Sequence, residues 1–579
     1  MSTVTMGTGQ AAAPTVRDRH HASKAILNSD WLLIFLPVAS VALWIWGLAR
    51  ANPRAMTDLG FLSLFGPTNV LALLLLAAGV MLGLQRKARE PLLALQLVTF
   101  LALVHATPAV IYGTVRYAWA WKHIGIVDYI LRHGAVDPTI NVLGIYHNWP
   151  GFFAASALLT NLAGRDNLLT IATWAPFVFN VMNLVVLRFL LKGLTQDKRL
   201  VWLSLWFFFL INWVGQDYFS PQAMAYVLYL ACLGLLIRGV TGWRRILLFI
   251  LFVTAIAVSH QLTPIMLFIA VTGLVVLRQT RGWYLPVIAA VVPLAWALTA
   301  ARSYAVPGFF DLLSTFGQPV QNADETLEMA TVRNLDQRLV VWGGRSVVAI
   351  AVIVALIGVW RCWRNRTLQL TAVILMVLPG ILLVITGFDG EVLLRVMLFA
   401  APFIAFNAAT AAIPQPGAQL RGRQLAAIAA CTALFLPGFL LGYYGKERQN
   451  YFTPGEVQAA AWVSEHAKPG SLLVEGSRNY PSQFRNYENF TYVAIDREPQ
   501  TSWSGLLADP ADVLSDWLSN PRYADSYVLI TRSQEIEVDT EGPMPAGSLQ
   551  SIDSALRRSP EFKVAFETGD ATVFVLRGK

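Results

Sequence analysis

Charged residues are scarce in this chain of 579 residues. They make up 14% of it, whereas hydrophobic residues make up 55% and the mean hydropathy is +0.52. A soluble protein of ordinary composition has about 25% charged residues, so the composition excludes an ordinary soluble protein. Repeated apolar runs of about 20 residues instead predict a polytopic α-helical membrane protein.

Cysteine is nearly absent. The three cysteines, Cys232, Cys362 and Cys431, lie in or beside apolar runs and show no metal-ligand spacing. The long polar segments contain none, which excludes a disulfide framework there. The first 25 residues have no apolar core, so the sequence predicts no cleaved signal peptide.

The net charge of +9 comes from basic residues in short turns between apolar runs. Membrane insertion produces this distribution, so we do not expect nucleic-acid binding. Every second connection is basic, which predicts a cytoplasmic amino terminus and places the other connections outside the plasma (inner) membrane. The basic connections lie near residues 86–89, 192–199, 238–245, 278–281, 361–366 and 421–423.

The sequence divides into three parts. We expect a flexible cytoplasmic tail at 1–28, a transmembrane domain at 29–445 with about 13 spans, and a polar extracytoplasmic α/β domain at 446–579. The last part has the size of an independent domain, and its short apolar runs are typical of strands. Thr453-Pro454-Gly455-Glu456 has the pattern of a helix start, with a capping threonine and a glutamate three residues later.

Two long connections are predicted outside. The first, 113–166, is much longer than a simple link between spans, which indicates a functional loop. It ends in an apolar segment, 151–164, that is too short for an ordinary span. We therefore expect a re-entrant or interfacial helix there. The second outer loop is predicted at 301–345.

Asp128 is the first candidate catalytic or metal-binding carboxylate, and it lies within the first outer loop. Arg132 is four residues further on, so the two share a face if the segment is helical. A surface ion pair is the alternative interpretation. Lys122, nearby in the same loop, is a candidate ligand for a donor phosphate.

Asp217 is a lone carboxylate between two apolar segments, flanked by Gln216 and Tyr218. Ionisable groups at membrane depth are costly, which makes Asp217 a candidate catalytic or metal-binding residue and its neighbours candidate lining residues. The alternative is a cap for the helix that begins at Pro221.

Glu391 and Arg395 are one helical turn apart at the start of an apolar run. Glu391 is a third candidate catalytic carboxylate. Arg395 can meet a lipid phosphate at the headgroup level with its forked donors, and Phe388-Asp389-Gly390 would then form a flexible rim. Mutual neutralisation of the pair is the alternative.

His260 ends one apolar run, and Thr263-Pro264 begins the next. An imidazole, a hydroxyl and a helix amino terminus together suit an anion, so His260 is a candidate phosphate ligand. The alternative is a polar pair that satisfies the break between two helices.

An aromatic strip in the first outer loop contains Tyr146, His147 and Trp149. These residues are candidates for lining a sugar or acceptor site, with Tyr146 or Trp149 stacked on a sugar. Aromatic side chains are also ordinary at membrane interfaces, which is the alternative interpretation.

The layout resembles the GT-C superfamily of integral-membrane glycosyltransferases. The resemblance covers most of the chain: an outer first loop with helices, a Tyr146…Trp149-Pro150-Gly151-Phe152-Phe153 segment, a span closed by basic residues, and Gln216-Asp217 where the family often has its second outer acid. The sequence departs from the family where the first loop usually begins with an acid, because Trp119-Ala120-Trp121-Lys122-His123 stands there.

The resemblance implies a GT-C-like fold and an inverting transfer of a sugar from a polyprenyl-phosphate donor to a cell-envelope acceptor, which is a glycan, a lipid or a protein. A divalent metal, Mg²⁺ or Mn²⁺, takes part in some members, and Asp128 or Asp217 would hold it here. The chemistry would use one of the three carboxylates as base, with Arg395, His260 and Lys122 on the phosphate. The competing interpretations are a lipid-linked-glycan flippase or transporter, an O-antigen-ligase-like or polymerase-like enzyme, and a non-catalytic membrane protein with a partner-binding outer domain.

Overall fold

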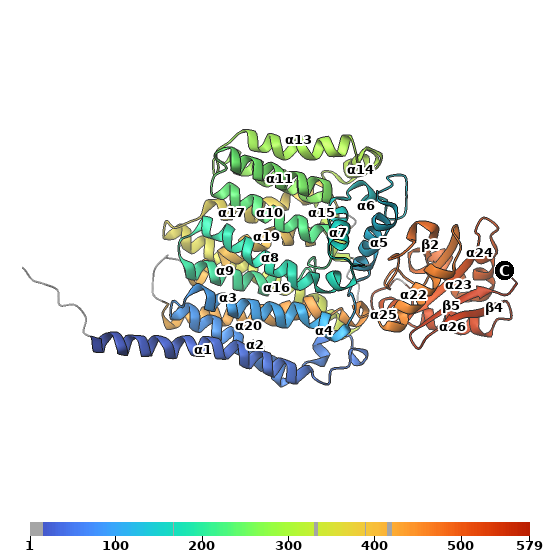
Figure 1. Cartoon of the computed structure of the whole chain (residues 1–579), viewed down its shortest axis with the longest axis horizontal. Coiled ribbons are helices and arrows are strands. Elements are labelled where there is room, and N and C mark those ends of the chain that lie inside the picture. Colours follow the sequence, from blue (N-terminus) through green and yellow to red (C-terminus); the bar gives the residue numbers. More distant parts are fainter. Residues whose placement is uncertain are drawn as a thin grey trace, which may run out of the picture.

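The computed structural model describes residues 16–165, 167–328, 334–387, 390–413, 420–542 and 544–578. It contains a large bundle of helices and a smaller domain built on a β-sheet at one end of it (Figure 1). This arrangement confirms the predicted helical fold with a carboxy-terminal α/β domain. Phe388 and Asp389, the predicted rim, lie outside the described residues.

The long helices of the bundle run roughly side by side (Figure 1). They are α1 (Val16–Leu48), α2 (Pro67–Gln85), α3 (Glu90–Leu101), α4 (Thr107–Tyr112), α8 (Leu169–Leu194), α9 (Lys198–Ile211), α10 (Pro221–Ile237), α11 (Trp243–Ser259), α12 (Leu262–Val276), α13 (Tyr284–Leu298), α16 (Leu335–Arg364), α19 (Val392–Ala412) and α20 (Gly422–Tyr444). Helix α1 begins at Val16, well inside the predicted tail.

Seven helical segments among the described residues are long and apolar enough to cross a membrane, or eight if the bent pair Tyr284–Leu298 and Arg302–Phe310 is one span. Several other segments predicted as spans form shorter helices. One of these predicted spans is broken into α17 (Leu370–Val377), a 3₁₀ turn at Leu378–Ile381 and α18 (Leu382–Ile385). The figure of about 13 spans stays a prediction.

Helix α9 lies at the centre of the bundle. Every residue from Arg199 to Ile211 is buried, and the helix packs against α8, α19 and α20. A helix that is apolar all round is stable only where other elements cover every face. The run Trp206-Phe207-Phe208-Phe209 therefore fixes this helix in the interior.

The bundle has two different ends. At one end, Glu90 at the start of α3 accepts hydrogen bonds from Arg188 and Lys192 at the end of α8, and Arg89 pairs with Asp30 of α1. At the other end, the loop after α9 meets the carboxy-terminal half of α20, where Tyr443 donates a hydrogen bond to Asp217. Basic connections thus collect at the end away from the sheet domain.

Residues 113–168 leave the bundle at the end of α4 and return to it at the start of α8. They form α5 (Ala118–His133), α6 (Gly144–Asn148) and α7 (Gly151–Leu162). Because α3 begins and α8 ends together at Glu90, α4 ends and α8 begins at the same, opposite end. The three helices therefore cap that end. Two further helices, α14 (Arg302–Thr315) and α15 (Pro319–Glu328), lie in the second predicted outer loop.

The carboxy-terminal domain has a five-stranded sheet in the order β2-β1-β3-β5-β4. Strands β1 (Ser471–Glu475), β2 (Phe490–Ala494) and β3 (Ser526–Thr531) are parallel, whereas β4 (Phe562–Glu567) and β5 (Ala571–Leu576) are antiparallel to their neighbours. The surrounding helices are α21 (Glu447–Asn450), α22 (Pro454–His466), α23 (Gln500–Ala508), α24 (Pro510–Ser519), α25 (Arg532–Thr540) and α26 (Ser548–Arg558). Helix α22 starts with the predicted capping box at Thr453 and Glu456.

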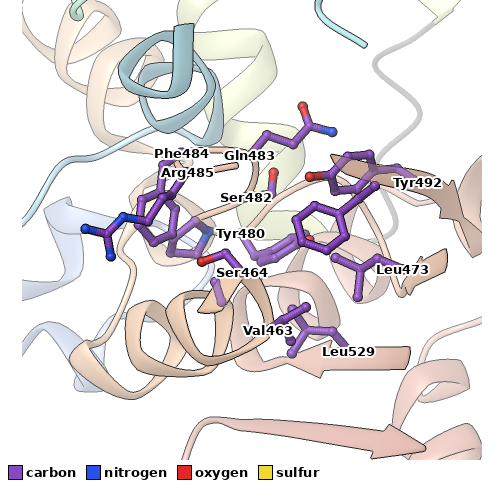
Figure 2. Close-up of a pocket in the computed structure, with 13 residues that line it drawn as sticks. Val463, Ser464, Leu473, Tyr480, Ser482, Gln483, Phe484, Arg485, Tyr492 and Leu529 are labelled. Carbon is purple, nitrogen blue, oxygen red and sulfur yellow. The ribbon is translucent and has the colours of Figure 1, made fainter. Parts of the chain in front are cut away.

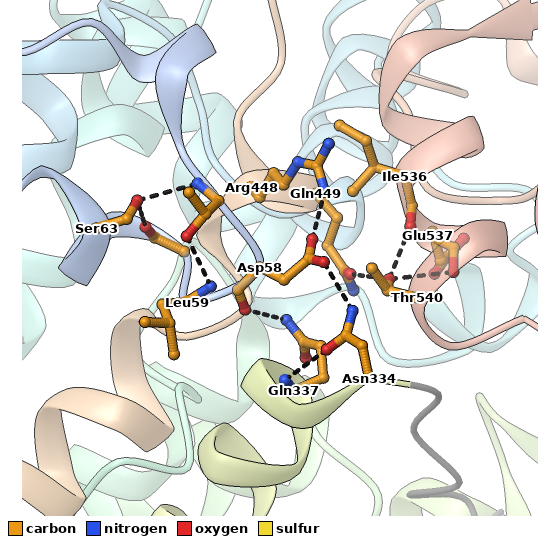
Figure 3. Close-up of polar contacts among 12 residues, drawn as sticks. Asp58, Leu59, Ser63, Asn334, Gln337, Arg448, Gln449, Ile536, Glu537 and Thr540 are labelled. Carbon is orange, nitrogen blue, oxygen red and sulfur yellow. Dashed lines mark hydrogen bonds and ion pairs between the residues drawn. The ribbon is translucent and has the colours of Figure 1, made fainter.

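Polar contacts join the two parts of the molecule. Asp58, in the connection between α1 and α2, pairs with Arg448 and accepts a hydrogen bond of 2.7 Å from Asn334 (Figure 3). Arg54, in the same connection, pairs with Asp570 of the sheet domain. The connection between α1 and α2 therefore holds the sheet domain against the bundle through two ion pairs.

Candidate functional site

Asp217 lies in the loop between α9 and α10, at the end of the bundle that carries α5 and α6. The residue is only 7% exposed. Ser220, not Asp217, caps α10, because the Ala223 amide donates to the Ser220 hydroxyl. The capping interpretation of Asp217 therefore does not apply, and its carboxylate is directed into the bundle.

Three side chains surround one oxygen of this carboxylate. Oδ2 of Asp217 accepts hydrogen bonds from Asn180 Nδ2 at 2.7 Å and from the Tyr443 hydroxyl at 2.9 Å, and it lies 3.0 Å from His105 Nδ1. Oδ1 is buried and has no hydrogen-bond partner among the described residues. One oxygen is thus held in place, while the other is left for a ligand.

His105 reaches Asp217 because of an irregularity in its helix. Residues Ala102–Ala106, between α3 and α4, form a π-helical turn. Such turns are rare, and they often occur at functional sites. His105 also contacts the Tyr443 hydroxyl at 2.8 Å.

A second buried charge lies next to this group. Arg116 pairs with Glu447 at 2.8 Å, and its guanidinium lies 4.2 Å from the ring centre of Tyr117 and 4.7 Å from that of Tyr443. Tyr117 has φ 69°, a left-handed conformation that is costly for a side chain of this size. This backbone conformation places the Tyr117 ring between Arg116 and Tyr218, whose ring centre is 5.5 Å away.

The charges around Asp217 keep it ionised. Burial alone would raise the pKa of Asp217, but the hydrogen bond and charge of His105, the charge of Arg116 and the hydrogen bond from Tyr443 outweigh it. The pKa of Asp217 therefore lies below its ordinary value. A carboxylate in this state can accept a proton or oppose a developing positive charge.

Tyr218, the next residue, belongs to an aromatic group that also contains His123 and Tyr146. The rings of His123 and Tyr218 are stacked, with centres 5.7 Å apart and planes 6° apart, and Tyr146 meets His123 edge-on at 4.9 Å. Trp119, which is 46% exposed, lies 6.4 Å from Tyr146. The group presents flat aromatic surfaces beside the buried carboxylate.

Arg395 and Glu391 lie close to this aromatic group. Burial raises the pKa values of Tyr146 and Tyr218, while the charge of Arg395 opposes the rise and that of Glu391 adds to it. Arg395 donates to Glu391 at 2.5 Å. The Arg395 side chain is 9% exposed and that of Glu391 42% exposed, so the acid is accessible while the arginine is covered.

Three of the predicted site residues therefore lie around one loop, namely Asp217, Tyr218 and Tyr146, and the charges of Glu391 and Arg395 act on the two tyrosines. Gln216 is half-buried in the same loop. His260 is linked to the loop through Thr263, which accepts from Gln222 of α10. However, Nδ1 of His260 accepts from the amides of Leu262 and Thr263. This arrangement agrees with the alternative interpretation, in which His260 satisfies the polar groups at the break between two helices. The two amides are therefore already bonded within the chain.

The other predicted residues lie elsewhere. Asp128 pairs with Arg132 at 2.8 Å, and Arg132 also pairs with Glu488 of the sheet domain, so Asp128 has the ion pair of the alternative interpretation. Lys122 lies over the Trp119 ring at 4.5 Å, and the charges that act on it belong to the sheet domain.

His147 and Trp149 are also turned away from the aromatic group. Both nitrogens of His147 are engaged, one with the Asp137 amide and the other with the Tyr487 hydroxyl. Trp149 is 8% exposed and packs edge-on against Tyr304. Neither ring offers an open face for stacking.

The two carboxylates proposed as metal ligands, Asp217 and Asp128, already have polar partners within the chain. Asp217 is surrounded by hydrogen-bond donors and Asp128 by an arginine. Among the described residues, no group of three or more His, Cys, Asp or Glu side chains could hold a metal ion. The part of the chain that the structure describes therefore does not decide whether a metal takes part, and the metal stays a prediction.

Sequence reasoning missed His105, Asn180, Arg116, Tyr443 and Glu447. Asn180 and Tyr443 lie in apolar runs, close to Asn183 and Tyr444, and each resembles an ordinary polar residue of a span. The sequence still contained one indication of their role. A polar side chain inside a membrane span is energetically costly and requires a partner.

Comparisons with known proteins give distant structural similarities only. No family model matches the chain, and no curated protein matches it. Among solved structures, it is similar to the Archaeoglobus fulgidus oligosaccharyltransferase tethered with an acceptor peptide (12% identity, 85% of this chain and 72% of the other, TM-score 0.46). A second similar structure is ArnT from Cupriavidus metallidurans bound to undecaprenyl phosphate. The sequence identity is 11%, the match covers 83% of this chain and 97% of the other, and the TM-score is 0.46.

A third similar structure is the arabinofuranosyltransferase AftD from Mycobacteria, in an R1389S mutant form. The identity is 15% and the TM-score 0.42, and the match covers 79% of this chain but 41% of that one. The sequence identity to each of these three proteins is 15% or lower. Similarity at this level assigns neither a family nor an activity to the chain.

Proposed function

We propose that the chain is a membrane glycosyltransferase that moves a sugar from a polyprenyl-phosphate donor to an acceptor at the end of the bundle that carries the sheet domain. The observation that supports this most directly is the loop at Asp217. A buried, ionised carboxylate with one free oxygen stands beside stacked aromatic rings and an arginine.

The parts of this site match the needs of the reaction. An acceptor hydroxyl gives its proton to Oδ1 of Asp217 and attacks the anomeric carbon, while the bond to the lipid phosphate breaks. Proton removal by a placed base contributes about 10²–10⁴-fold. Glu391 is the other carboxylate within reach of the aromatic group.

Arg395 would stabilise the departing phosphate. It stands in the first turn of α19, buried beside the more exposed Glu391. A guanidinium offers two parallel donors to a phosphate. The aromatic faces of Tyr146, Tyr218 and Trp119 would hold the sugar.

Transfer by the reconstituted protein tests the proposal. Nanodiscs would be given radiolabelled polyprenyl-phosphate sugars and a cell-envelope fraction, and the release of free polyprenyl phosphate would be measured. Arg395→Gln is expected to lower the rate about 10²-fold, because it removes charge stabilisation at the leaving group.

Arg557→Gln is the matched control, because Arg557 of α26 forms the same i,i+4 pair with an acid, Asp553, as Arg395 does with Glu391. It is expected to keep near wild-type transfer. Movement of the labelled lipid across proteoliposomes without release of lipid phosphate would contradict the proposal and favour a transporter.

A further inference from the structure

A segment of the sheet domain, Tyr480–Glu488, packs directly onto helix α5. A Cβ added to Gly125 of α5 would lie 1.9 Å from the carbonyl oxygen of Gln483, so only a glycine permits this backbone approach. Beside it, Phe484 meets the fully buried ring of Trp121 edge-on at 5.2 Å. Figure 2 shows Gln483 and Phe484 in this segment, between the sheet domain and the blue-green helix of the bundle.

The same segment also holds the ends of α5 and α6. Tyr487 is fully buried, and its hydroxyl lies 2.5 Å from Nε2 of His147 in α6. The carboxylate of Glu488 accepts hydrogen bonds from both terminal nitrogens of Arg132, near the end of α5. A bidentate pair of this kind fixes orientation as well as distance.

Charged groups of the sheet domain also act on Lys122 of α5. Burial lowers the pKa of Lys122 to about 8, and Glu475 at the end of β1 opposes that shift, as Glu537 of α25 does. Arg478 and Arg497 of the sheet domain act in the other direction. The charges that act on Lys122 thus lie around the carboxyl ends of the parallel strands, which is where open α/β sheets usually bind ligands.

The opposite face of α5 forms the aromatic group of the site. His123 is two residues from both Trp121 and Gly125, and residues two apart on a helix point to different faces. Its Nδ1 lies 2.8 Å from the carbonyl of Phe219, and its ring stacks on Tyr218. Helix α5 is therefore enclosed between the sheet domain and the loop that carries Asp217.

We propose that the sheet domain is a positioning element of the site. Its segment 480–488 fixes α5, and α5 in turn holds His123 against Tyr218 and so sets the arrangement of the loop at 212–220. The reaction that is measured rests on the proposed function, whereas the mechanical link can be measured without substrate.

Hydrogen–deuterium exchange of the full chain in nanodiscs tests the link, with Gly125→Ala as the variant. The new methyl group must displace Gln483, so exchange is expected to become faster in 480–488, in α5 and in the loop at 212–220. Gly144→Ala is the matched control, because Gly144 is a buried glycine of α6 with no heavy atom within 4 Å of the added Cβ. It is expected to exchange as the wild type does.

Phe484→Ala is a second variant that removes the contact without inserting an atom, in case Gly125→Ala fails to assemble. Faster exchange in 480–488 alone, with α5 and the loop at wild-type rates, would overturn the proposal. So would wild-type exchange everywhere in both variants.

Transfer kinetics give a second measurement. If the wild type transfers sugar, Phe484→Ala is expected to lower kcat about 10- to 100-fold, the cost of a small misplacement of reacting groups, with the thermal unfolding of the bundle unchanged. An unchanged kcat would contradict the positioning role. A wild type that transfers no sugar would contradict the proposed function alone, because the exchange pattern would still decide the link.

Discussion

Two buried acidic regions of this molecule respond to burial in opposite ways. At Asp217, donors and positive charges outweigh desolvation and lower the pKa. At the strand ends of the sheet domain, desolvation dominates and raises the pKa of Glu475 to about 7. Burial alone therefore does not determine the state of a carboxylate, since its neighbours decide whether the charge is kept.

The contrast also separates the two aspartates predicted as catalytic. Asp217 is enclosed by Asn180, His105 and Tyr443, whereas Asp128 pairs with Arg132 at the domain contact, where its side chain is 25% exposed. The first arrangement keeps a buried carboxylate, that of Asp217, in its ionised form. The second is an ordinary ion pair shared between two elements.

The largest effect is expected from removing the two carboxylates in turn. Asp217→Asn should lower transfer by about 10²-fold or more, because the base is lost, while Asp128→Asn should stay within about threefold of wild type, since exposed pairs contribute little. Release of polyprenyl phosphate measures both. Equal losses in the two variants would remove the distinction between the regions.

A smaller effect is expected at the hydrogen bond from Tyr443 to Asp217. Tyr443→Phe removes one of the donors that lower the pKa of Asp217, so this pKa should rise and the acid limb of the pH–rate profile should move to higher pH. A hydrogen bond to a charged group corresponds to a shift of about one pH unit. An acid limb that does not move would show that Asp217 does not control it.

The sheet domain should depend on pH in the opposite sense. Because the pKa of Glu475 is raised from 4.5 to about 7, its contribution to stability is fully present below pH 4.5 and is lost as the pH rises through 7. The unfolding temperature of the domain should therefore fall across this interval. Glu475→Gln should flatten the fall, and calorimetry of the full chain from pH 4.5 to 8 measures it.

Glu537 must be considered in the same experiment, because its pKa is also raised to about 7. The double variant Glu475→Gln, Glu537→Gln should be flatter than either single variant. A slope that is unaffected in the double variant would place the titrating groups elsewhere.

The smallest effect is expected at the ion pair between Arg132 and Glu488. Both side chains are partly exposed, at 32% and 13%, so Glu488→Gln should reduce the free energy of unfolding of the domain by about 1 kcal/mol or less. Chemical denaturation followed by domain-specific fluorescence measures this. A loss well above that value would make this pair a principal link between the domains.

Local signals in the sequence were sufficient for much of the fold. The capping box at Thr453 depends on residues three apart, and it is present as predicted. The apolar runs Leu472–Val474, Tyr527–Ile530 and Val573–Leu576 became the three central strands β1, β3 and β5. Such patterns need only neighbouring residues, so a single sequence contains them.

The candidate site was less accessible to sequence reasoning because its contacts join distant parts of the chain. Asn180 and Tyr443 lie 37 and 226 residues from Asp217. Asp217 and Arg395 were identified by the cost of charge at membrane depth. The partners of Asp217 are uncharged or lie inside helices, and only the packing of α3, α8 and α20 brings them together.

The π-helical turn at Ala102–Ala106 ties the site to the length of a helix. Such a turn accommodates one residue more than an α-helical turn. Deleting one of its residues before His105 would let the helix become regular and would rotate His105 by about 100° about the axis relative to α3. A chain with the same apolar runs but one residue fewer here would keep its fold and lose the imidazole from Asp217. The contact of His105 with Asp217 therefore depends on the number of residues in this turn as well as on the histidine itself.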